Sequence, residues 1–440
     1  MKEITFKRLN QYESNYNQDH ANTVLRRALA KNAITDIAHV SEREMDQNHY
    51  FSLELETLSA NNQKATGRCW LFAGLNVLRE VAAKKYNVKD IEFSQNYQAF
   101  YDKFEKINYF IQSMDDFLHV DGDDRTLKHL LEQGIQDGGQ WDMFVSLVKK
   151  YGIVIKEAMP ETHSSSNSKG MNRLINLQLK KYACDARKLA SENRLNELEQ
   201  LKEDTLSNLY GFLVTNLGVP PKTFNFEYVD KDKVYHMESN LDPVKFYEGL
   251  EMNLDDYVSV INAPTKDKPF NKSYTVSYLG NVIGGKEIRH LNIEMNRLVE
   301  LVLSQLKDKE VVWFGADVSF DNNREKGIWD DKQFDYNTTF KMNFNMTKEE
   351  RLDYVSGAMN HAMVITGVNL IGDEPTKWRI ENSWGVERGN KGYYLMSQTW
   401  FLEHTYQAVI HKKHLTEAEL KSYHQTPIIL KPWDPMGSLA

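Results

Sequence analysis

The sequence predicts an α+β fold in which a helical half precedes a β half. From about residue 61 to residue 255, apolar residues recur mostly at the spacing of an α-helix, and beyond residue 256 short strand patterns replace them. The 440 residues are enough for about three domain-sized units or one elaborated domain. The 41% hydrophobic and 26% charged content is typical of a globular protein with a large core. The predicted parts are an N-terminal arm (residues 1–60), a helical half (61–175), a further helical stretch (176–255), a β half (256–430) and a C-terminal tail (431–440).

Composition argues against several classes of protein. The formal net charge of −8 argues against nucleic-acid binding, which needs clustered lysine and arginine. The two cysteines, Cys69 and Cys184, exclude a disulfide framework and favour a reducing compartment. Residues 1–7 hold no apolar signal segment, and no run of 18 apolar residues suggests a membrane span. We therefore expect a cytoplasmic protein that does not bind membranes.

The arm contains a predicted helix, residues 22–30, and a half-buried strand, residues 51–56, whose residues alternate between apolar and polar. A longer helix follows the turn at Gly67 and Arg68. Its apolar stripe is formed by Leu71, Leu75, Leu78 and Ala82.

Cys69 lies at the predicted N-terminus of this helix. The positive end of the helix dipole favours a thiolate there, and the thiolate is the reactive form of cysteine. Gln63, in the turn before the helix, carries amide N–H donors that can face the same space. A buried structural cysteine is the alternative, because most free cysteines are of that kind.

Three further patterns lie in the two helical stretches. The acidic run at residues 121–124 resembles a calcium loop, but Arg125 takes a ligand position and Thr126 replaces the required glycine, so a helix cap is favoured. Gly138 and Gly139 precede a helix at residues 144–150 and form either a plain turn or a place where another backbone comes close. Residues 163–168 are predicted to form a polar loop and residues 195–210 a helix. Cys184 is interpreted as a structural cysteine without a catalytic role.

The β half begins with three strand patterns, residues 257–261, 273–279 and 311–316. A helix at residues 295–306 separates the last two, and Thr347 with Glu350 forms a capping-box signature for another helix. The strand at residues 361–367 is apolar on both faces and therefore buried.

Two candidate polar residues lie in the later strands. His361 begins the buried strand, and alternation along residues 378–382 places Asn382 on the same face as Trp378 and Ile380. A further strand covers residues 392–396. Alone, His361 reads as a satisfied core histidine, since the chain has 13 histidines.

Together these residues provide the four parts that acyl transfer by cysteine requires. Cys69 would be the nucleophile and His361 the general base, while Asn382 would orient the imidazole. Gln63 and the backbone N–H of Cys69 would stabilise the oxyanion. The sequence shows no internal repeat, phosphate-binding glycine loop or Cys/His metal spacing, so we expect neither cofactor nor metal.

These motifs resemble the papain-type cysteine peptidases, and in particular the bleomycin hydrolase and aminopeptidase C branch. The resemblance extends over nearly the whole chain and rests on specific motifs: Gln63, residues 67–72, 138–145, 274–285, 313–315, 360–363, 381–385 and the tail 432–440. Ala316 departs from some relatives, which have a cysteine there; we regard the change as harmless.

The resemblance implies a papain-like fold whose helical and β halves enclose the cleft, with residues 176–255 as an insertion. It implies a cysteine aminopeptidase acting on peptides, assembled as a homohexamer whose sites face an internal chamber. Trp384 would shield His361 and Asn382 from water, and Gly138 and Gly139 would line the substrate backbone.

The tail would enter the cleft, and the carboxylate of Ala440 would face the free α-ammonium of a peptide. Trp433 and Leu439 make this tail unusually apolar for a chain end. Three alternatives stay open at this stage: an endopeptidase of the same family, a catalytically silent oligomeric binding protein, and a transglutaminase-like acyl transferase. The last would more often have aspartate where this chain has Asn382.

Overall fold

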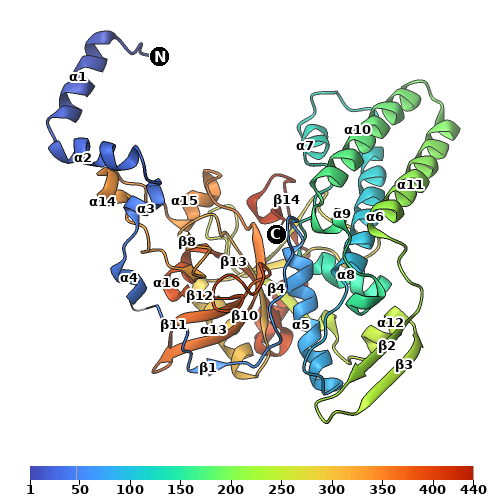
Figure 1. The fold of residues 1–440 in the computed structure, drawn as a ribbon. Helices are drawn as coiled ribbons and strands as arrows, with labels where there is room; N and C mark the ends of the chain where they lie inside the picture. Colours follow the sequence, from blue (N-terminus) through green and yellow to red (C-terminus); the bar gives the residue numbers. More distant parts are fainter. Residues whose placement is uncertain (46, 440) are drawn as a thin grey trace.

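The computed structural model describes residues 1–45 and 47–439. Figure 1 shows three parts: an arm that projects from the body, a helical half, and a half built around a β-sheet. The predicted α+β class is confirmed. Among the described residues, no helix is long and apolar enough to cross a membrane.

The N-terminal arm consists of four short helices. They are α1 (Phe6–Asn17), α2 (His20–Leu29), α3 (Ile34–Ala38) and α4 (Glu42–Met45). The side chains of Thr5 and Asp19 accept hydrogen bonds at the N-termini of α1 and α2, and neither helix contains a buried residue. The first two helices therefore extend into solvent without a packed face (Figure 1). The strand predicted at residues 51–56 of the arm is reduced to β1 (Leu53–Glu54), which pairs with the central sheet.

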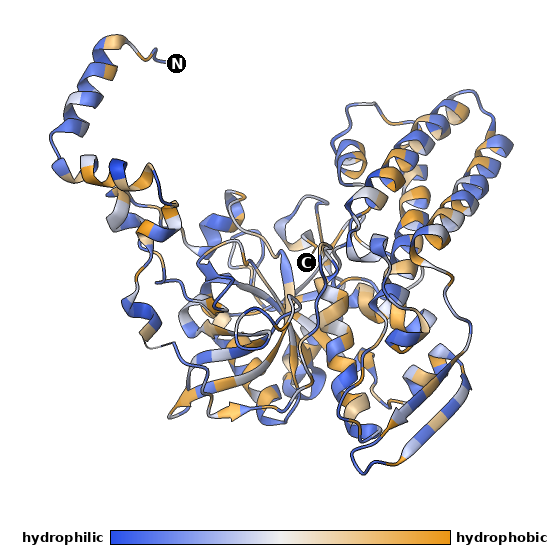
Figure 2. Ribbon diagram, viewed as in Figure 1, coloured by the Kyte–Doolittle hydropathy of each residue, from blue (hydrophilic) through white to orange (hydrophobic). Residues whose placement is uncertain are grey.

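The helical half is organised around α5 (Cys69–Lys85), which is buried on nearly every side. The other helices of this half and of the following stretch are α6 (Gln95–Ser113), α7 (Arg125–Gln133), α8 (Trp141–Tyr151), α9 (His163–Ser166), α10 (Lys169–Ser191), α11 (Leu195–Leu217) and α12 (Pro243–Glu248). Asp124 caps α7, as the helix-cap interpretation of the acidic run predicted. Helices α10 and α11 form a projecting pair with apolar and polar residues interspersed along them (Figure 2).

Two expectations for these stretches are wrong. The stretch 176–255 is not wholly helical, because it contains a hairpin of β2 (Phe224–Val229) and β3 (Tyr235–Leu241). Phe226 and Tyr228 alternate with polar residues, and their rings pack against Tyr86, the C-cap residue of α5. This one-sided packing of alternate residues favours a strand. The polar loop at residues 163–168 contains the short helix α9, because Thr162 and Ser165 form a capping box there.

The β half is one mixed sheet in the order β14-β5-β6-β4-β13-β7-β10-β11-β12-β9-β8, with β1 beside β10. Its strands are β4 (Tyr257–Ile261), β5 (Lys272–Val276), β6 (His290–Asn292), β7 (Val312–Ala316), β8 (Asn322–Asn323), β9 (Ile328–Trp329), β10 (His361–Ile371), β11 (Glu374–Glu381), β12 (Tyr393–Ser397), β13 (Thr405–His411) and β14 (Ile428–Leu430). Its helices are α13 (Met295–Lys307), α14 (Tyr336–Phe340), α15 (Lys348–Asp353), α16 (Gln398–His404) and α17 (Glu417–His424). The predicted strands and the helices α13 and α15 are present, whereas β6, β8, β9, β13, β14, α14, α16 and α17 were not predicted.

The two halves meet where α5 packs against the central strand β10. Residues of β4, β7, β12 and the first eight positions of β10 are buried, as expected for strands covered on both faces. Ala316 pairs directly with His361 in the antiparallel β7–β10 ladder. The start of α5 meets the start of β10 where the backbone N–H of Ala362 contacts Cys69 Sγ.

Candidate active site

Cys69 is the first residue of α5, where the sequence placed it. Arg68, the N-cap residue, makes no side-chain capping bond, so the first backbone N–H groups of the helix remain available. The Cys69 Sγ accepts a hydrogen bond from the backbone N–H of Ala362, over 3.4 Å, and the thiol is 2% exposed. The nucleophile candidate therefore lies against the peptide that follows His361.

His361 and Asn382 form a hydrogen-bonded pair at the start of β10 and the end of β11. Their Nε2 and Oδ1 atoms are 2.9 Å apart. The backbone N–H of Ser383 also donates to Asn382 Oδ1, over 2.8 Å, which identifies that atom as the oxygen. Because this oxygen can only accept, Nε2 of His361 carries the hydrogen, and Nδ1 is left as the basic nitrogen.

Trp384 covers this pair. Its ring stacks on the His361 ring with centroids 4.8 Å apart and an interplanar angle of 25°. Tyr394 meets the same indole edge-on at 5.7 Å. His361 is 4% exposed and Asn382 is fully buried, so the hydrogen bond between them is kept from water.

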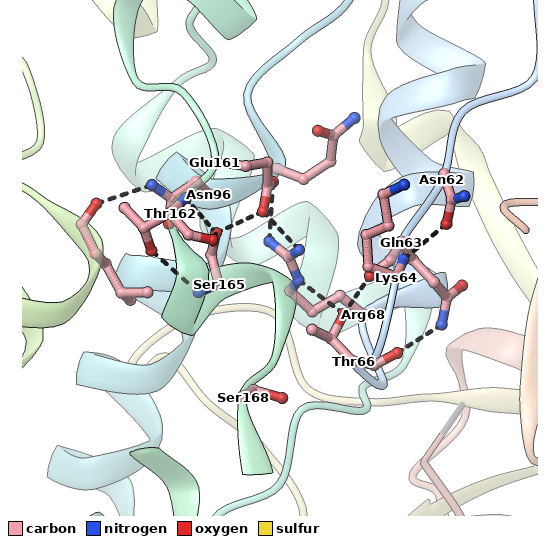
Figure 3. Close-up of polar contacts among 12 residues, drawn as sticks. Asn62, Gln63, Lys64, Thr66, Arg68, Asn96, Glu161, Thr162, Ser165 and Ser168 are labelled. Atoms are coloured by element: carbon pink, nitrogen blue, oxygen red, sulfur yellow. Dashed lines mark hydrogen bonds and ion pairs between the residues drawn. The ribbon is translucent and has the colours of Figure 1, made fainter. Parts of the chain in front are cut away.

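Gln63 is held by hydrogen bonds from both sides. Its Nε2 donates to the Thr66 carbonyl over 2.7 Å, and its Oε1 accepts from Ser383 Oγ over 2.5 Å (Figure 3 shows the first bond). Its backbone N–H donates to the Ser383 carbonyl over 2.8 Å. The amide nitrogen carries two hydrogens, and the bond to Thr66 uses one of them.

The turn before Cys69 is fixed by an ion pair between buried Arg68 and partly exposed Glu161, which the sequence analysis did not identify. Arg68 donates in parallel to both carboxylate oxygens of Glu161, over 3.1 and 2.8 Å, and its Nε donates to Thr66 Oγ1 over 3.1 Å (Figure 3). The Arg68 side chain is 2% exposed. A charged residue directly beside the cysteine was the available signal, but its partner lies 93 positions away.

Gly138 and Gly139 are buried beside this turn. A Cβ on Gly139 would lie 2.5 Å from the indole of Trp70, so only glycine fits there. The carbonyl of Gly138 accepts from Lys106 Nζ over 2.6 Å. Asp137, missed by the sequence analysis, accepts from the backbone N–H of Gly67 over 3.1 Å and thereby ties the glycine pair to the nucleophile's turn.

Ionisation at the site differs from the simple helix-dipole expectation. Burial raises the pKa of the Cys69 thiol to about 11, although backbone N–H groups of Ala362 and Trp70 lower it. Burial also lowers the pKa of His361 to about 4, against the opposing effect of its bond to Asn382. The predicted thiolate therefore does not follow from the helix N-terminus alone. Burial disfavours the charged form of each group, so a thiolate at Cys69 would need a cation beside it, such as a protonated His361 ring.

The C-terminal tail lies across the boundary between the halves. Gln140, next to the glycine pair, donates to the carbonyl of Ser438 over 2.5 Å. Ser438 Oγ donates to the carbonyl of Met359, two residues before His361, over 2.6 Å. One tail residue thus contacts both walls beside the candidate site. Ala440, predicted to carry the carboxylate that binds the substrate amine, lies outside the described residues.

Earlier tail residues are anchored separately. The guanidinium of Arg125 lies 3.8 Å from the ring centroid of Trp433, and Asp434 pairs with Lys268 over 3.0 Å. Strand β14 pairs in parallel with β5. A cavity of about 840 Å³ adjoins the tail and is lined by both halves, including Tyr109 of the helical half, Asn360 of the β half and Leu439 of the tail.

Comparisons with known proteins agree with this geometry. The model of the Peptidase C1-like family matches residues 3–437. Proteins named Aminopeptidase C from Lactobacillus delbrueckii subsp. lactis and Listeria innocua are each 44% identical, over 100% of this chain and 99% of theirs. The crystal structure of PepW from Lactobacillus rhamnosis HN001 superposes with a TM-score of 0.97 at 45% identity, covering 100% of this chain and 99% of that one. The chain therefore belongs to the Peptidase C1-like family, as a papain-like cysteine peptidase of the bleomycin hydrolase and aminopeptidase C branch.

Proposed function

We propose that this protein is a cysteine aminopeptidase that removes N-terminal residues from peptides. The observation that carries the proposal is the junction of α5 with β10, where Cys69 lies beside the hydrogen-bonded His361–Asn382 pair. The relatives named Aminopeptidase C, 44% identical over the whole chain, support the choice of activity.

The proposed reaction begins when the Cys69 proton passes to Nδ1 of His361. The thiolate attacks the carbonyl carbon of the first peptide bond, and the developing oxyanion is stabilised by Gln63 Nε2 and the backbone N–H of Cys69. His361 then gives its proton to the leaving nitrogen as the C–N bond breaks, which leaves a thioester. Water, deprotonated by His361, attacks the thioester and releases the residue as a carboxylic acid, while the proton returns to sulfur.

Several contacts support these roles. Asn382 keeps Nε2 of His361 protonated and so leaves Nδ1 for the proton transfer. Trp384, stacked on the imidazole, excludes water from that bond. Because burial opposes a charge on either group alone, the thiolate and imidazolium stabilise each other as a pair.

We further propose that the tail selects free N-termini. Ser438 bridges both walls, which supports a tail that would obstruct the non-primed side of the cleft. The carboxylate of Ala440 would then pair with the α-ammonium of a bound peptide. Gly138 and Gly139 would line the substrate backbone, and their neighbour Gln140 already contacts the backbone of the tail.

The decisive experiment compares aminoacyl coumarin amides with their N-acetylated twins. We expect hydrolysis of the free amides only, and its loss after iodoacetamide treatment or in Cys69→Ala. Equal cleavage of the acetylated twins would favour an endopeptidase of the same family. Cleavage of neither series, by protein that retains its fold, would favour a binding protein without catalytic activity.

We also propose assembly into a homohexamer through the N-terminal arm. The arm exposes apolar residues that a monomer would leave in water, including Ile4, Phe6, Leu9 and Tyr12. Light scattering tests this assembly: six chains of 51.2 kDa are expected for the full chain, and smaller particles after deletion of residues 1–30. A full-length monomer would contradict it.

A further inference from the structure

Glu381 is a buried carboxylate that the proposed reaction does not use. It is the last residue of β11, directly before Asn382, and is 2% exposed. Its Oε1 accepts from Arg79 Nη2 over 2.5 Å and from Asn76 Nδ2 over 2.7 Å. Both donors belong to α5, whose first residue is Cys69. One carboxylate oxygen therefore joins the nucleophile's helix to the residue beside Asn382.

The same cluster reaches the segment that leads to Gln63. Asn76 Oδ1 accepts from Asn61 Nδ2 over 2.9 Å. The carbonyl of Asn61 in turn accepts from the backbone N–H of Gly385, over 3.0 Å. These contacts connect the chain segments that carry Cys69, Asn382 and Gln63, and Glu381 itself pairs with Val364 of β10, the strand that begins at His361.

Stabilisation of the fold does not by itself explain a carboxylate at this position. The Oε2 of Glu381 has no hydrogen-bond partner within the described part of the chain. Burial raises the pKa of Glu381 to about 7, so the charged form is disfavoured despite Arg79. Packed apolar residues commonly stabilise a core at least as well as a buried ion pair does. An apolar residue at this position could not form the directional hydrogen bonds that Glu381 makes to two α5 side chains.

We propose that Glu381 is a positioning residue: by binding Arg79 and Asn76 it fixes α5, and with it Cys69, relative to the strand end that carries Asn382. The inference rests on the proposed function, because it assigns Glu381 to the geometry of that reaction. Proton transfer and attack need the reacting atoms within a few tenths of an ångström of their productive positions. Since Cys69 and His361 lie on different halves, a fixed contact between those halves meets this need.

The test uses the full-length Glu381→Gln variant, which keeps the side chain's shape and one acceptor oxygen but removes its charge. Glu419→Gln is the matched control, because Glu419 pairs with Arg297 over 2.8 Å within the β half, away from the site. For each variant, kcat and KM on a free aminoacyl coumarin amide, the rate of Cys69 alkylation by iodoacetamide, and the thermal midpoint are measured.

We expect Glu381→Gln to lower kcat by about 10- to 100-fold with KM within about twofold of the original. Cys69 alkylation should slow by a similar factor at a temperature where the variant is folded. The control should keep both rates even if its thermal midpoint falls. Unchanged kcat and alkylation in Glu381→Gln, or a loss of kcat with unchanged alkylation, would overturn the proposal.

If Glu381→Gln does not fold, Asn76→Ala provides the test, since it removes the Asn76 bonds to Glu381 and Asn61 and keeps the ion pair of Glu381 with Arg79. The same direction of change in kcat and alkylation is expected, with smaller size, and no change would overturn the proposal. Wild-type protein and Cys69→Ala are assayed in parallel. If the wild type does not cleave the substrate, or Cys69→Ala does, it is the proposed function that fails, independently of Glu381.

Discussion

At Cys69, two effects oppose each other at one sulfur atom. Backbone N–H groups at the start of α5 and from Ala362 stabilise a thiolate, but burial raises the pKa of the thiol to about 11. Cys184 is exposed and has no such constraint. In the proposed reaction, the reactivity of Cys69 therefore comes from proton transfer to His361 rather than from the helix alone.

This balance predicts how the two cysteines react. In the wild type, iodoacetamide at about pH 6 should label Cys69 much faster than Cys184, because the pair with His361 supplies a thiolate at a pH where an ordinary thiol is protonated. In His361→Ala the order should reverse, since the isolated buried thiol keeps its raised pKa. Peptide mass spectrometry after timed labelling measures both rates. Similar labelling rates in the wild type would rule out an activated Cys69.

Gln63 should contribute to turnover rather than to folding. Gln63→Ala should lower kcat by about 10²-fold or more, equivalent to about 3 kcal/mol, since loss of one oxyanion donor typically has that effect. Asn382→Ala should be milder than His361→Ala, because proton transfer can occur without the orienting amide. Steady-state kinetics with circular dichroism as a folding control measure these changes. A fully active Gln63→Ala would remove Gln63 from the site.

The residue types of the site could be predicted from the sequence, but their environment could not. Cys69, His361, Asn382 and Gln63 occur in recognisable local motifs. Burial of the thiol depends on Ala362, nearly 300 positions away, and no local pattern reveals it. The sequence shows Glu381 only as the residue before Asn382. Its hydrogen-bond partners could not be predicted, because they lie on a helix of the other half.

Among the elements, the turn that leads into α5 depends most on a distant contact. Arg68 is almost fully buried and its charge is balanced by the bidentate pair with Glu161 (Figure 3). Removing one partner of a buried pair leaves an uncompensated charge. The sequence predicts the turn from Gly67, but it does not show what holds the turn in place.

Glu161→Gln should accordingly lower the free energy of unfolding by about 3 kcal/mol. It should also slow catalysis, because the turn positions Gln63 and Cys69. Urea denaturation measures the first effect. The matched control is Glu192→Gln, which disrupts the exposed contact with Arg194 and should leave stability nearly unchanged. Equal stability of the two variants would show that the Arg68 pair does not fix the turn.

Helices and strands were predicted correctly where the apolar periodicity extends over many residues. They were missed where contacts with distant residues determine the secondary structure. The helices α5, α8, α11 and α13 follow extended apolar stripes. The β2–β3 hairpin was assigned to a helical stretch, because its strands become stable only when Phe226 and Tyr228 pack against Tyr86. The local sequence holds the alternation, but the packing partner lies about 140 positions earlier.

At the scale of the whole molecule, the site is a product of the contact between two separately built halves. The helical half supplies the nucleophile and the glycine pair, and the sheet supplies His361 and Asn382. The tail then contacts both halves through Ser438. The proposed function thus assigns chemistry and substrate selection to different parts of the chain, which makes the two separable by experiment.

That separation gives the sharpest prediction. Deleting residues 436–440 removes Ser438 and the residues beyond it, but leaves Trp433 and Asp434, which anchor the earlier tail to Arg125 and Lys268. The truncated protein should cleave free aminoacyl amides poorly, because the partner for the α-ammonium is gone. It should gain cleavage of N-acetylated amides and internal peptide bonds, because the non-primed side of the cleft is opened.

The control is Ser438→Ala in the full-length chain, which removes the bond to the Met359 carbonyl while keeping the tail and its carbonyl contact with Gln140. Its preference for free N-termini should persist, in contrast to the truncated protein. Each protein digests one peptide with and without an acetylated N-terminus. Mass spectrometry of the products then measures the preference for free N-termini. Because Cys69 and His361 are untouched, total peptidase activity should remain in the truncated protein. If it still requires a free N-terminus, the selector lies elsewhere in the cleft wall and the tail is only a structural tie between the halves.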